Sequence, residues 1–105
     1  KGTGVTTLDF AKAMIDEGFH PMTMYFPLVV AGAMLVEPTE TESKASLDEF
    51  IHALRSLAEA AKAGETERFK TAPHFAPMKR LDETRAARRP VLTYQEPESL
   101  KIAAE

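Results

Sequence analysis

The side chains that could do chemistry in this sequence are three histidines, a cluster of glutamates and a basic stretch near the end of the chain. The histidines are His20, His52 and His74, and no two of them have the three- or four-residue spacing with which a helix brings two imidazoles to one metal ion. We therefore predict no metal site. His20 and His74 each adjoin a proline in a predicted loop, where an imidazole commonly caps a helix end or bonds to the backbone. We favour such a structural use over a role in a site.

The glutamate cluster consists of Glu37, Glu40 and Glu42, just before a predicted long helix. Carboxylates could act as acid and base or bind a hard cation. Acidic groups at this place more commonly interact with the positive end of the helix dipole. We favour that second interpretation.

The basic stretch covers residues 79–89, with five basic and two acidic groups. It could contact phosphate, but no aromatic residue is interleaved with it, which favours a solvated or subunit-facing strip. The whole chain has a net charge of −3, so its electrostatics do not favour nucleic acid or an anionic membrane.

Residues 18–36 are uncharged over a length that could span a bilayer, yet two prolines and two glycines would interrupt a lipid-exposed helix. We predict neither nucleic acid nor a membrane as a partner.

Length and composition indicate a small globular domain. A chain of 105 residues with 44% hydrophobic and 28% charged residues builds one core of modest size. The sequence has no cysteine, which excludes disulfides and thiolate chemistry and makes the cytoplasm the default compartment. It begins at Lys1 without an initiator methionine or a signal peptide, so we expect a piece of a longer chain.

The first half of the sequence predicts a helix followed by a hairpin. The helix covers residues 5–17, with Thr6 or Thr7 as its N-cap and Gly18 as its end, after which Phe19 folds back on the helix. Residues 22–30 are rich in β-branched and aromatic side chains and predict a strand interrupted by Pro27. A tight connection at residues 31–33 leads to a second strand over residues 33–37, which suggests an antiparallel pair.

A long amphipathic helix is predicted next, with a capping box at Thr39 and Glu42 or at Ser46 and Glu49, and an end at Gly64. One face of this helix is apolar, so we expect it to cover the sheet. Its apolar residues are Leu47, Phe50, Ile51, Leu54, Leu57, Ala58 and Ala61. From residue 65 the periodicity disappears and four of the seven prolines follow. We therefore predict an α+β domain, a short antiparallel sheet covered by helices over residues 1–64, with an extended docking tail over residues 65–105.

Three blocks of sequence resemble a known enzyme family. The residues alone show no nucleophile elbow, P-loop or dinucleotide fingerprint and give no reaction. However, TLDFAKAMIDEGFHPMTMYFPLVV at 7–30, MLVEPTETESKASLDEFIHAL at 34–54 and TAPHFAPMKRLDETRAARRPVL at 71–92 occur in the order found at the end of glycine dehydrogenase (decarboxylating). This enzyme is the P-protein of the glycine cleavage system, and the resemblance is greatest to subunit 2 of the bacterial two-subunit form. It implies the small C-terminal domain of a fold-type I pyridoxal-phosphate enzyme.

The resemblance also implies a reaction. In this family pyridoxal phosphate supports the release of CO2 from glycine, and the aminomethyl group passes to the lipoyl arm of the H-protein. The implied partners are the large domain of the same subunit, the partner P-protein subunit and the lipoylated H-protein. The Schiff-base lysine of the family lies upstream of this segment, so no catalytic or cofactor-binding residue is assigned. We expect the isolated chain to bind no cofactor and to be inactive.

The residues that the resemblance carries over lie in loops that such a domain turns towards the large domain. We predict that they form the mouth of the active site. They are His20, Pro21, Thr39, Glu40, Thr41, Glu42 and, from the tail, His74. Two alternatives stay open: the small domain of another fold-type I enzyme, and a stand-alone protein-binding domain.

Overall fold

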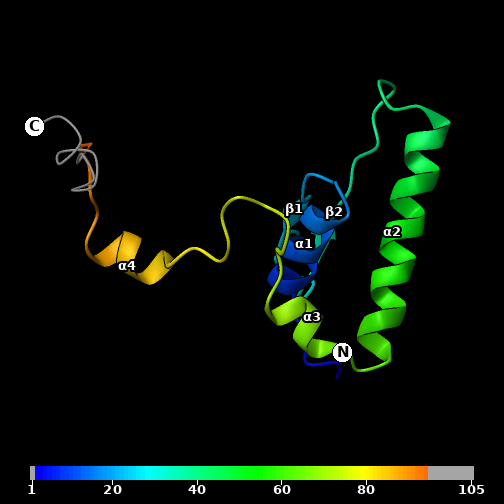
Figure 1. Ribbon diagram of the computed structural model, residues 1–105. Helices are drawn as coiled ribbons and strands as arrows, with labels where there is room; N and C mark the ends of the chain where they lie inside the picture. The colour runs from blue at the N-terminus through cyan, green and yellow to red at the C-terminus, as the bar shows by residue number, and fades with distance from the viewer. Residues whose placement is uncertain (1, 95–105) are drawn as a thin grey trace, which may run out of the picture.

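The computed structural model describes residues 2–94, which form four helices and one two-stranded antiparallel sheet (Figure 1). The elements in chain order are α1 (Thr7–Asp16), β1 (Thr23–Met24), β2 (Met34–Leu35), α2 (Lys44–Lys62), α3 (Thr66–Lys70) and α4 (Glu83–Arg88). A small domain with helices and a short antiparallel hairpin is therefore confirmed.

The first helix has the predicted signals at both ends. The side chain of Thr6 accepts a hydrogen bond from the Asp9 backbone N–H, and the Asp9 carboxylate accepts one from the Thr6 N–H, at 3.1 and 3.0 Å. At the other end, Gly18 has a φ of 86° and the Phe19 N–H donates to the Met14 carbonyl at 3.1 Å. This is the predicted Schellman ending, and it directs Phe19 back towards the core.

The hairpin is much shorter than predicted. Thr23 pairs with Leu35, and Met24 with Met34. The strand expected over residues 22–30 is wrong beyond Met24, and the supposed tight connection at 31–33 belongs to a loop over residues 25–33. The physical reason begins at Tyr25, whose φ of 57° takes the chain out of the extended conformation.

The long helix α2 begins between the two predicted capping boxes. Its N-cap is Ser43, whose hydroxyl accepts from the Ser46 N–H at 3.1 Å, so neither predicted capping box is used. Its predicted end is confirmed, since Gly64 has a φ of 89° and its N–H donates to the Ala61 carbonyl at 3.2 Å.

Helix α2 packs against α1 and α3 instead of covering the sheet. Its fully buried positions are Ala53, Leu57, Ala60 and Ala61, which form one cluster with Met14 of α1 and Phe69 of α3. Ile51, predicted to face the core, is 45% exposed. The small side chains of the α2 alanines allow α1 and α3 to approach α2 closely. The face of α2 that carries these alanines is rotated about the helix axis from the face that carries Ile51. The expected helix-on-sheet layer is therefore wrong.

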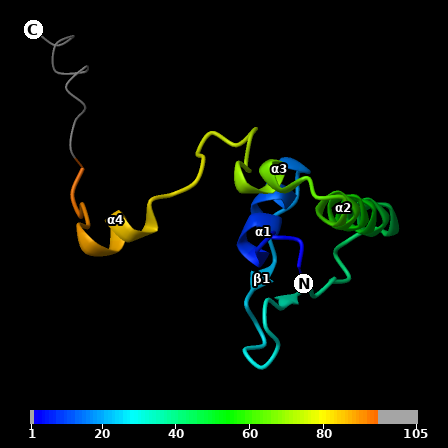
Figure 2. The same cartoon turned by 90° about the horizontal axis from the view of Figure 1, so that it is seen from below.

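The apolar core continues past residue 64. Phe69 and Ala72 are 0% exposed and belong to the core cluster, and the ring of Phe69 stacks on Phe10 with centroids 6.0 Å apart. The chain therefore does not leave the domain at Gly64, because α3 returns it to α1. Residues 81–94, here called the C-terminal arm, have only exposed side chains, as predicted for the tail. They are not extended throughout, because the Asp82 side chain accepts a hydrogen bond from the Arg85 N–H at 2.9 Å and caps α4. Figures 1 and 2 show α4 of this arm standing away from the other helices. The rest of the predicted tail, residues 95–105, lies outside the described residues.

Candidate functional site

An open groove of about 470 Å³ lies between the loop after α1, the hairpin and the start of α2. Its lining is largely apolar, and its titratable side chains, those of His20, Glu37 and Glu42, lie in the connecting segments. The lining residues are Phe19, His20, Pro21, Met22, Thr23, Leu35, Val36, Glu37, Pro38, Glu42, Ser46, Leu47 and Phe50.

Local structure sets the two walls of this groove. The Schellman ending of α1 turns Phe19 inward, where its ring meets the Phe50 ring edge-on with centroids 5.4 Å apart and an interplanar angle of 72°. His20 and Pro21 follow directly on this wall. On the other wall, the cap at Ser43 starts α2 immediately after Glu42. The fold therefore brings together two loops that are separated by the whole hairpin in sequence.

The groove contains some of the predicted site residues. His20, Pro21 and Glu42 line it, whereas Thr39, Glu40 and Thr41 are exposed residues outside its lining. The hydroxyls of Thr39 and Thr41 lie 2.7 Å apart and bond to each other. His74 lies elsewhere. Sequence reasoning missed the apolar lining residues Met22, Leu35, Leu47 and Phe50, because their types and spacing are those of ordinary core positions.

The side chains of the groove do not fit pyridoxal phosphate by themselves. A site for this cofactor needs a lysine for its aldehyde, and among the described residues the lining includes no lysine. Lys44, at the start of α2, pairs with Asp48. Glu37 and Glu42 would moreover repel a phosphate. The groove can offer an apolar surface with an imidazole and two carboxylates at its edge.

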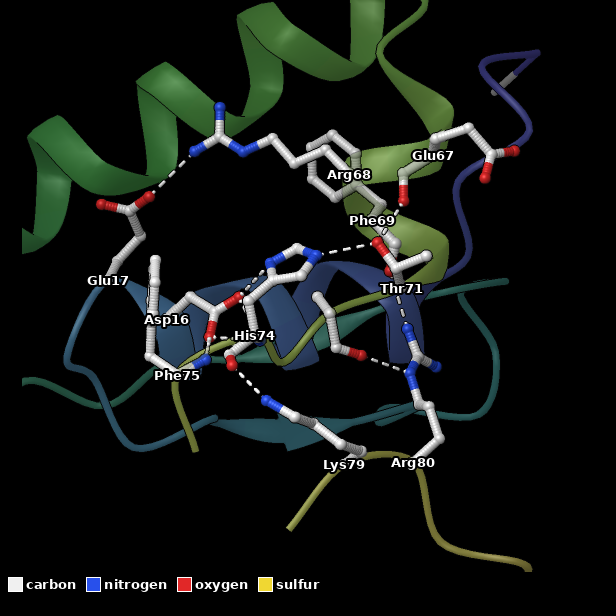
Figure 3. Close-up of polar contacts among 11 residues, drawn as sticks. Asp16, Glu17, Glu67, Arg68, Phe69, Thr71, His74, Phe75, Lys79 and Arg80 are labelled. Atoms are coloured by element: carbon white, nitrogen blue, oxygen red, sulfur yellow. Dashed lines mark hydrogen bonds and ion pairs between the residues drawn. The ribbon is translucent and has the colours of Figure 1, made fainter. Parts of the chain in front are cut away.

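His74 belongs to a second polar cluster, which joins the segment after α3 to the end of α1 (Figure 3). Its ring Nδ1 lies 2.8 Å from the Asp16 carboxylate, which also accepts the backbone N–H groups of His74 and Phe75 at 2.7 and 3.0 Å. Burial raises the pKa of Asp16, but these hydrogen bonds from Phe75 and His74 outweigh it and lower the pKa below its usual value.

The same cluster has the order of a hydroxyl–imidazole–carboxylate triad without its function. The Thr71 hydroxyl lies 2.8 Å from Nε2 of His74, but it also donates to the Glu67 carbonyl at 2.7 Å. The nearby backbone N–H groups are bound to Asp16, and neither Thr71 nor His74 lines the groove. A nucleophile would need a free hydroxyl, an oxyanion site and a cavity. The cluster therefore fastens residues 71–75 to α1.

A third cluster is centred on the buried Asp9. Its carboxylate accepts hydrogen bonds from Lys70 at 2.6 Å and Arg80 at 3.1 Å, besides the capping bond from Thr6. Arg80 also donates to the backbone carbonyl of Phe69 at 2.7 Å. Burial raises the pKa of Asp9, but the bonds from Lys70, Thr6 and Arg80 outweigh it and hold the pKa well below the usual carboxyl range.

Residues 2–94, the part of the chain that the structure describes, contain neither a metal-binding group of side chains nor a membrane-spanning helix. No group of three or more potential ligand side chains there is placed to hold a metal ion. None of the helices in that part of the chain has the length and apolar character needed to cross a bilayer.

Comparisons with known proteins agree on one family. Residues 1–78 match the model described as "Glycine dehydrogenase, C-terminal domain". The chain is 73% identical over its whole length to a "Probable glycine dehydrogenase (decarboxylating) subunit 2" of Caulobacter vibrioides, of which it covers 20%. It is 54% identical over 95 residues, 90% of the chain, to proteins of the same name from Listeria welshimeri and Shouchella clausii, covering 19% of each. The chain thus spans about a fifth of the length of these curated relatives.

Proposed function

Since the chain belongs to the glycine dehydrogenase C-terminal domain family, we propose that it forms the C-terminal part of subunit 2 of a pyridoxal-phosphate-dependent glycine decarboxylase. The complete enzyme of the glycine cleavage system releases CO2 from glycine and transfers the aminomethyl group to the lipoyl arm of the H-protein. The observation that carries this proposal is the 73% identity over the whole chain to a relative of that name.

The groove is the part of this chain that we assign to the active-site mouth. The support is geometric: two loops of the resemblance, one with His20 and Pro21 and one with Glu42, line the same groove. In the complete enzyme, residues of the large domain would hold the cofactor; in support, the described lining of the groove includes no lysine for its aldehyde. His20 and Glu42 are polar groups at an apolar wall, where they can orient a substrate and limit the access of water.

The apolar floor suits an uncharged hydrocarbon chain. Phe19, Leu47 and Phe50 offer aromatic and aliphatic surface on which the methylene groups of a lipoyl arm can pack. The groove is open on one side, so a long flexible arm can enter without a change in the fold of this domain.

The partners we propose are the large domain of the same subunit, the partner subunit of the P-protein and the lipoylated H-protein, all in the cytoplasm.

The C-terminal arm would lie on the large domain or on the partner subunit. Its short helix α4 has no buried residue in this chain, and helices of that length are marginal in water without tertiary contacts. Its exposed apolar residues are Leu81, Val91, Leu92 and Tyr94.

The groove assignment is tested in a hybrid subunit, the Caulobacter vibrioides relative with its matching segment replaced by this chain. We expect His20→Ala and Glu42→Ala each to reduce glycine decarboxylation by about tenfold to a hundredfold, because both remove a group that positions the reacting molecules. Turnover is measured as labelled CO2 released from carboxyl-labelled glycine, with the partner subunit and lipoylated H-protein present.

Glu40→Ala is the matched control, because Glu40 lies two residues from Glu42 but outside the groove lining. Its turnover should equal that of the unsubstituted hybrid, and the melting temperatures of all three variants should agree. Full activity of His20→Ala and Glu42→Ala would remove both residues from the site. A fall in activity only in proportion to a lower melting temperature would assign them a structural role.

A further inference from the structure

The loop between the two strands exposes an unusual amount of apolar surface. This hairpin loop covers residues 25–33, and its Leu28 and Val29 side chains are 86% and 92% exposed. Phe26 and Val30 beside them are about half exposed. Figure 2 shows the loop projecting beyond β1 and β2, away from α3. Ordered apolar surface that meets only water commonly marks an interaction site.

The loop has a defined backbone conformation. The Tyr25 N–H donates to the Ala33 carbonyl at 2.7 Å and closes the loop at its base. Within the loop, the Val30 N–H donates to the Pro27 carbonyl and the Ala33 N–H to the Val30 carbonyl, at 3.1 and 3.2 Å. Because these bonds hold the backbone, Leu28 and Val29 are presented at fixed positions.

The base of the loop is also attached to the start of α1. The Tyr25 hydroxyl accepts a hydrogen bond from the Leu8 backbone N–H at 3.2 Å, and the Thr7 hydroxyl donates to the Gly32 carbonyl at 2.8 Å. A Cβ atom on Gly32 would lie 3.1 Å from that Thr7 oxygen, and Gly32 has a φ of 70°, so glycine suits this close approach. A loop held in this way loses little conformational freedom when it binds.

We propose that the hairpin loop docks, through Leu28 and Val29, into an apolar and uncharged pocket on the remainder of the glycine dehydrogenase subunit. This inference rests on the proposed function. The length of the relative identifies the surface that covers the loop. The segment matched by this chain makes up only 20% of the Caulobacter vibrioides relative, so four fifths of that polypeptide is available to cover the loop.

The charge pattern indicates the chemistry of the partner surface. Residues 18–36 carry no charged side chain, so the loop cannot be guided by ion pairs and its contact is hydrophobic. The stretch at residues 79–89, with five basic and two acidic groups, would in contrast favour an acidic surface. The contribution of the loop to binding should therefore be insensitive to salt.

The test uses this chain and, as a separate polypeptide, the Caulobacter vibrioides relative without its matching segment. Their affinity is measured by titration calorimetry for the unsubstituted chain and for the double variant Leu28→Ser, Val29→Ser. We expect the double variant to bind about a hundredfold more weakly at both low and high salt, because two side chains lose their burial. Its melting temperature should be unchanged, since both side chains meet only water in the isolated chain.

Ile51→Ser is the matched control, an apolar-to-serine change at a partly exposed position of α2. It should bind like the unsubstituted chain. Equal binding by the double variant would overturn the proposal, and so would a dimer of this chain that the double variant dissociates, because a second copy would then be the occupant.

A second measurement applies even if the two polypeptides fail to assemble. Amide hydrogen exchange at residues 26–32 should be slower in the hybrid subunit than in the isolated chain, and equal rates would overturn the proposal. A hybrid that decarboxylates glycine with equal exchange rates would reject the docking loop alone. An inactive, correctly folded hybrid would reject the proposed function instead.

Discussion

Replacing Phe69 with alanine is expected to destabilise the chain by about 3–5 kcal/mol, the range for a large aromatic residue removed from a packed core. The Phe69 side chain is 0% exposed, stacks on Phe10 and belongs to a cluster with Met14 and Leu57. Small domains have a total free energy of unfolding of about 5–15 kcal/mol. The variant should therefore lose much of its stability, which urea unfolding followed by circular dichroism measures.

Phe75→Ala is the control for this experiment. Phe75 is the same residue type six positions later, but its side chain is 84% exposed. Its replacement should change the free energy of unfolding by no more than about 0.5 kcal/mol. If the two variants were equally stable, α3 would not belong to the core, and the core would end near Gly64.

Replacing Asp9 is expected to have the second largest effect on stability. Asp9→Ala removes the half of the capping box in which the carboxylate accepts from the Thr6 N–H, and it leaves Lys70 and Arg80 without their shared carboxylate. A broken buried pair costs about 3–5 kcal/mol, but both cations are partly exposed and regain water, so we expect about 2 kcal/mol. Asp48→Ala is the control, because its pair with Lys44 is exposed and should contribute less than about 0.5 kcal/mol.

The same carboxylate makes the stability depend on pH. The folded-state pKa of Asp9 is lowered, so its contribution is present above the ordinary carboxyl pKa of about 4 and is lost as the pH falls towards the folded value. Asp16 acts in the same direction. The free energy of unfolding should fall below about pH 4 in the unsubstituted chain and fall less steeply in Asp9→Asn. Identical pH profiles would contradict the ionic role of Asp9.

The two longer helices, α1 and α2, could be predicted from the sequence because their signals are local. The short helices α3 and α4 lie in the segment that was predicted to be extended. Gly18 and Gly64 end α1 and α2 as expected, and Thr6 caps α1. Each of these features depends on side chains within a few residues of the backbone groups that they satisfy. The sequence left the start of α2 open within residues 39–46, because several hydroxyl residues compete for the cap and only geometry selects Ser43.

The parts that sequence reasoning missed depend on contacts between distant residues. Asp9 binds Arg80, which is 71 positions away, and no local pattern announces such a pair. The apolar residues 28–30 have the composition of a strand, yet residues 2–94 supply no neighbouring strand or core for them. Strand propensity depends on such packing, which explains the failed prediction.

The candidate site was only partly predictable. The resemblance pointed to the loops with His20 and Glu42, and the structure brings these two residues to one groove. It did not distinguish Glu42 from Glu40, because the direction of a side chain in a loop depends on the turn that precedes the helix. His74 lies in the cluster with Asp16 and does not line the groove, so its place at the active-site mouth stays a prediction.

The central claim is that this chain is the C-terminal part of a glycine-decarboxylating subunit, and activity of the hybrid subunit tests it most directly. Three samples are compared for labelled CO2 release from glycine, each with the partner subunit, pyridoxal phosphate and lipoylated H-protein: the hybrid, the relative without its matching segment, and this chain alone. We predict that the hybrid is active at a level close to that of the intact relative and that the other two are inactive. A folded hybrid without activity would contradict the claim, and so would decarboxylation by this chain alone.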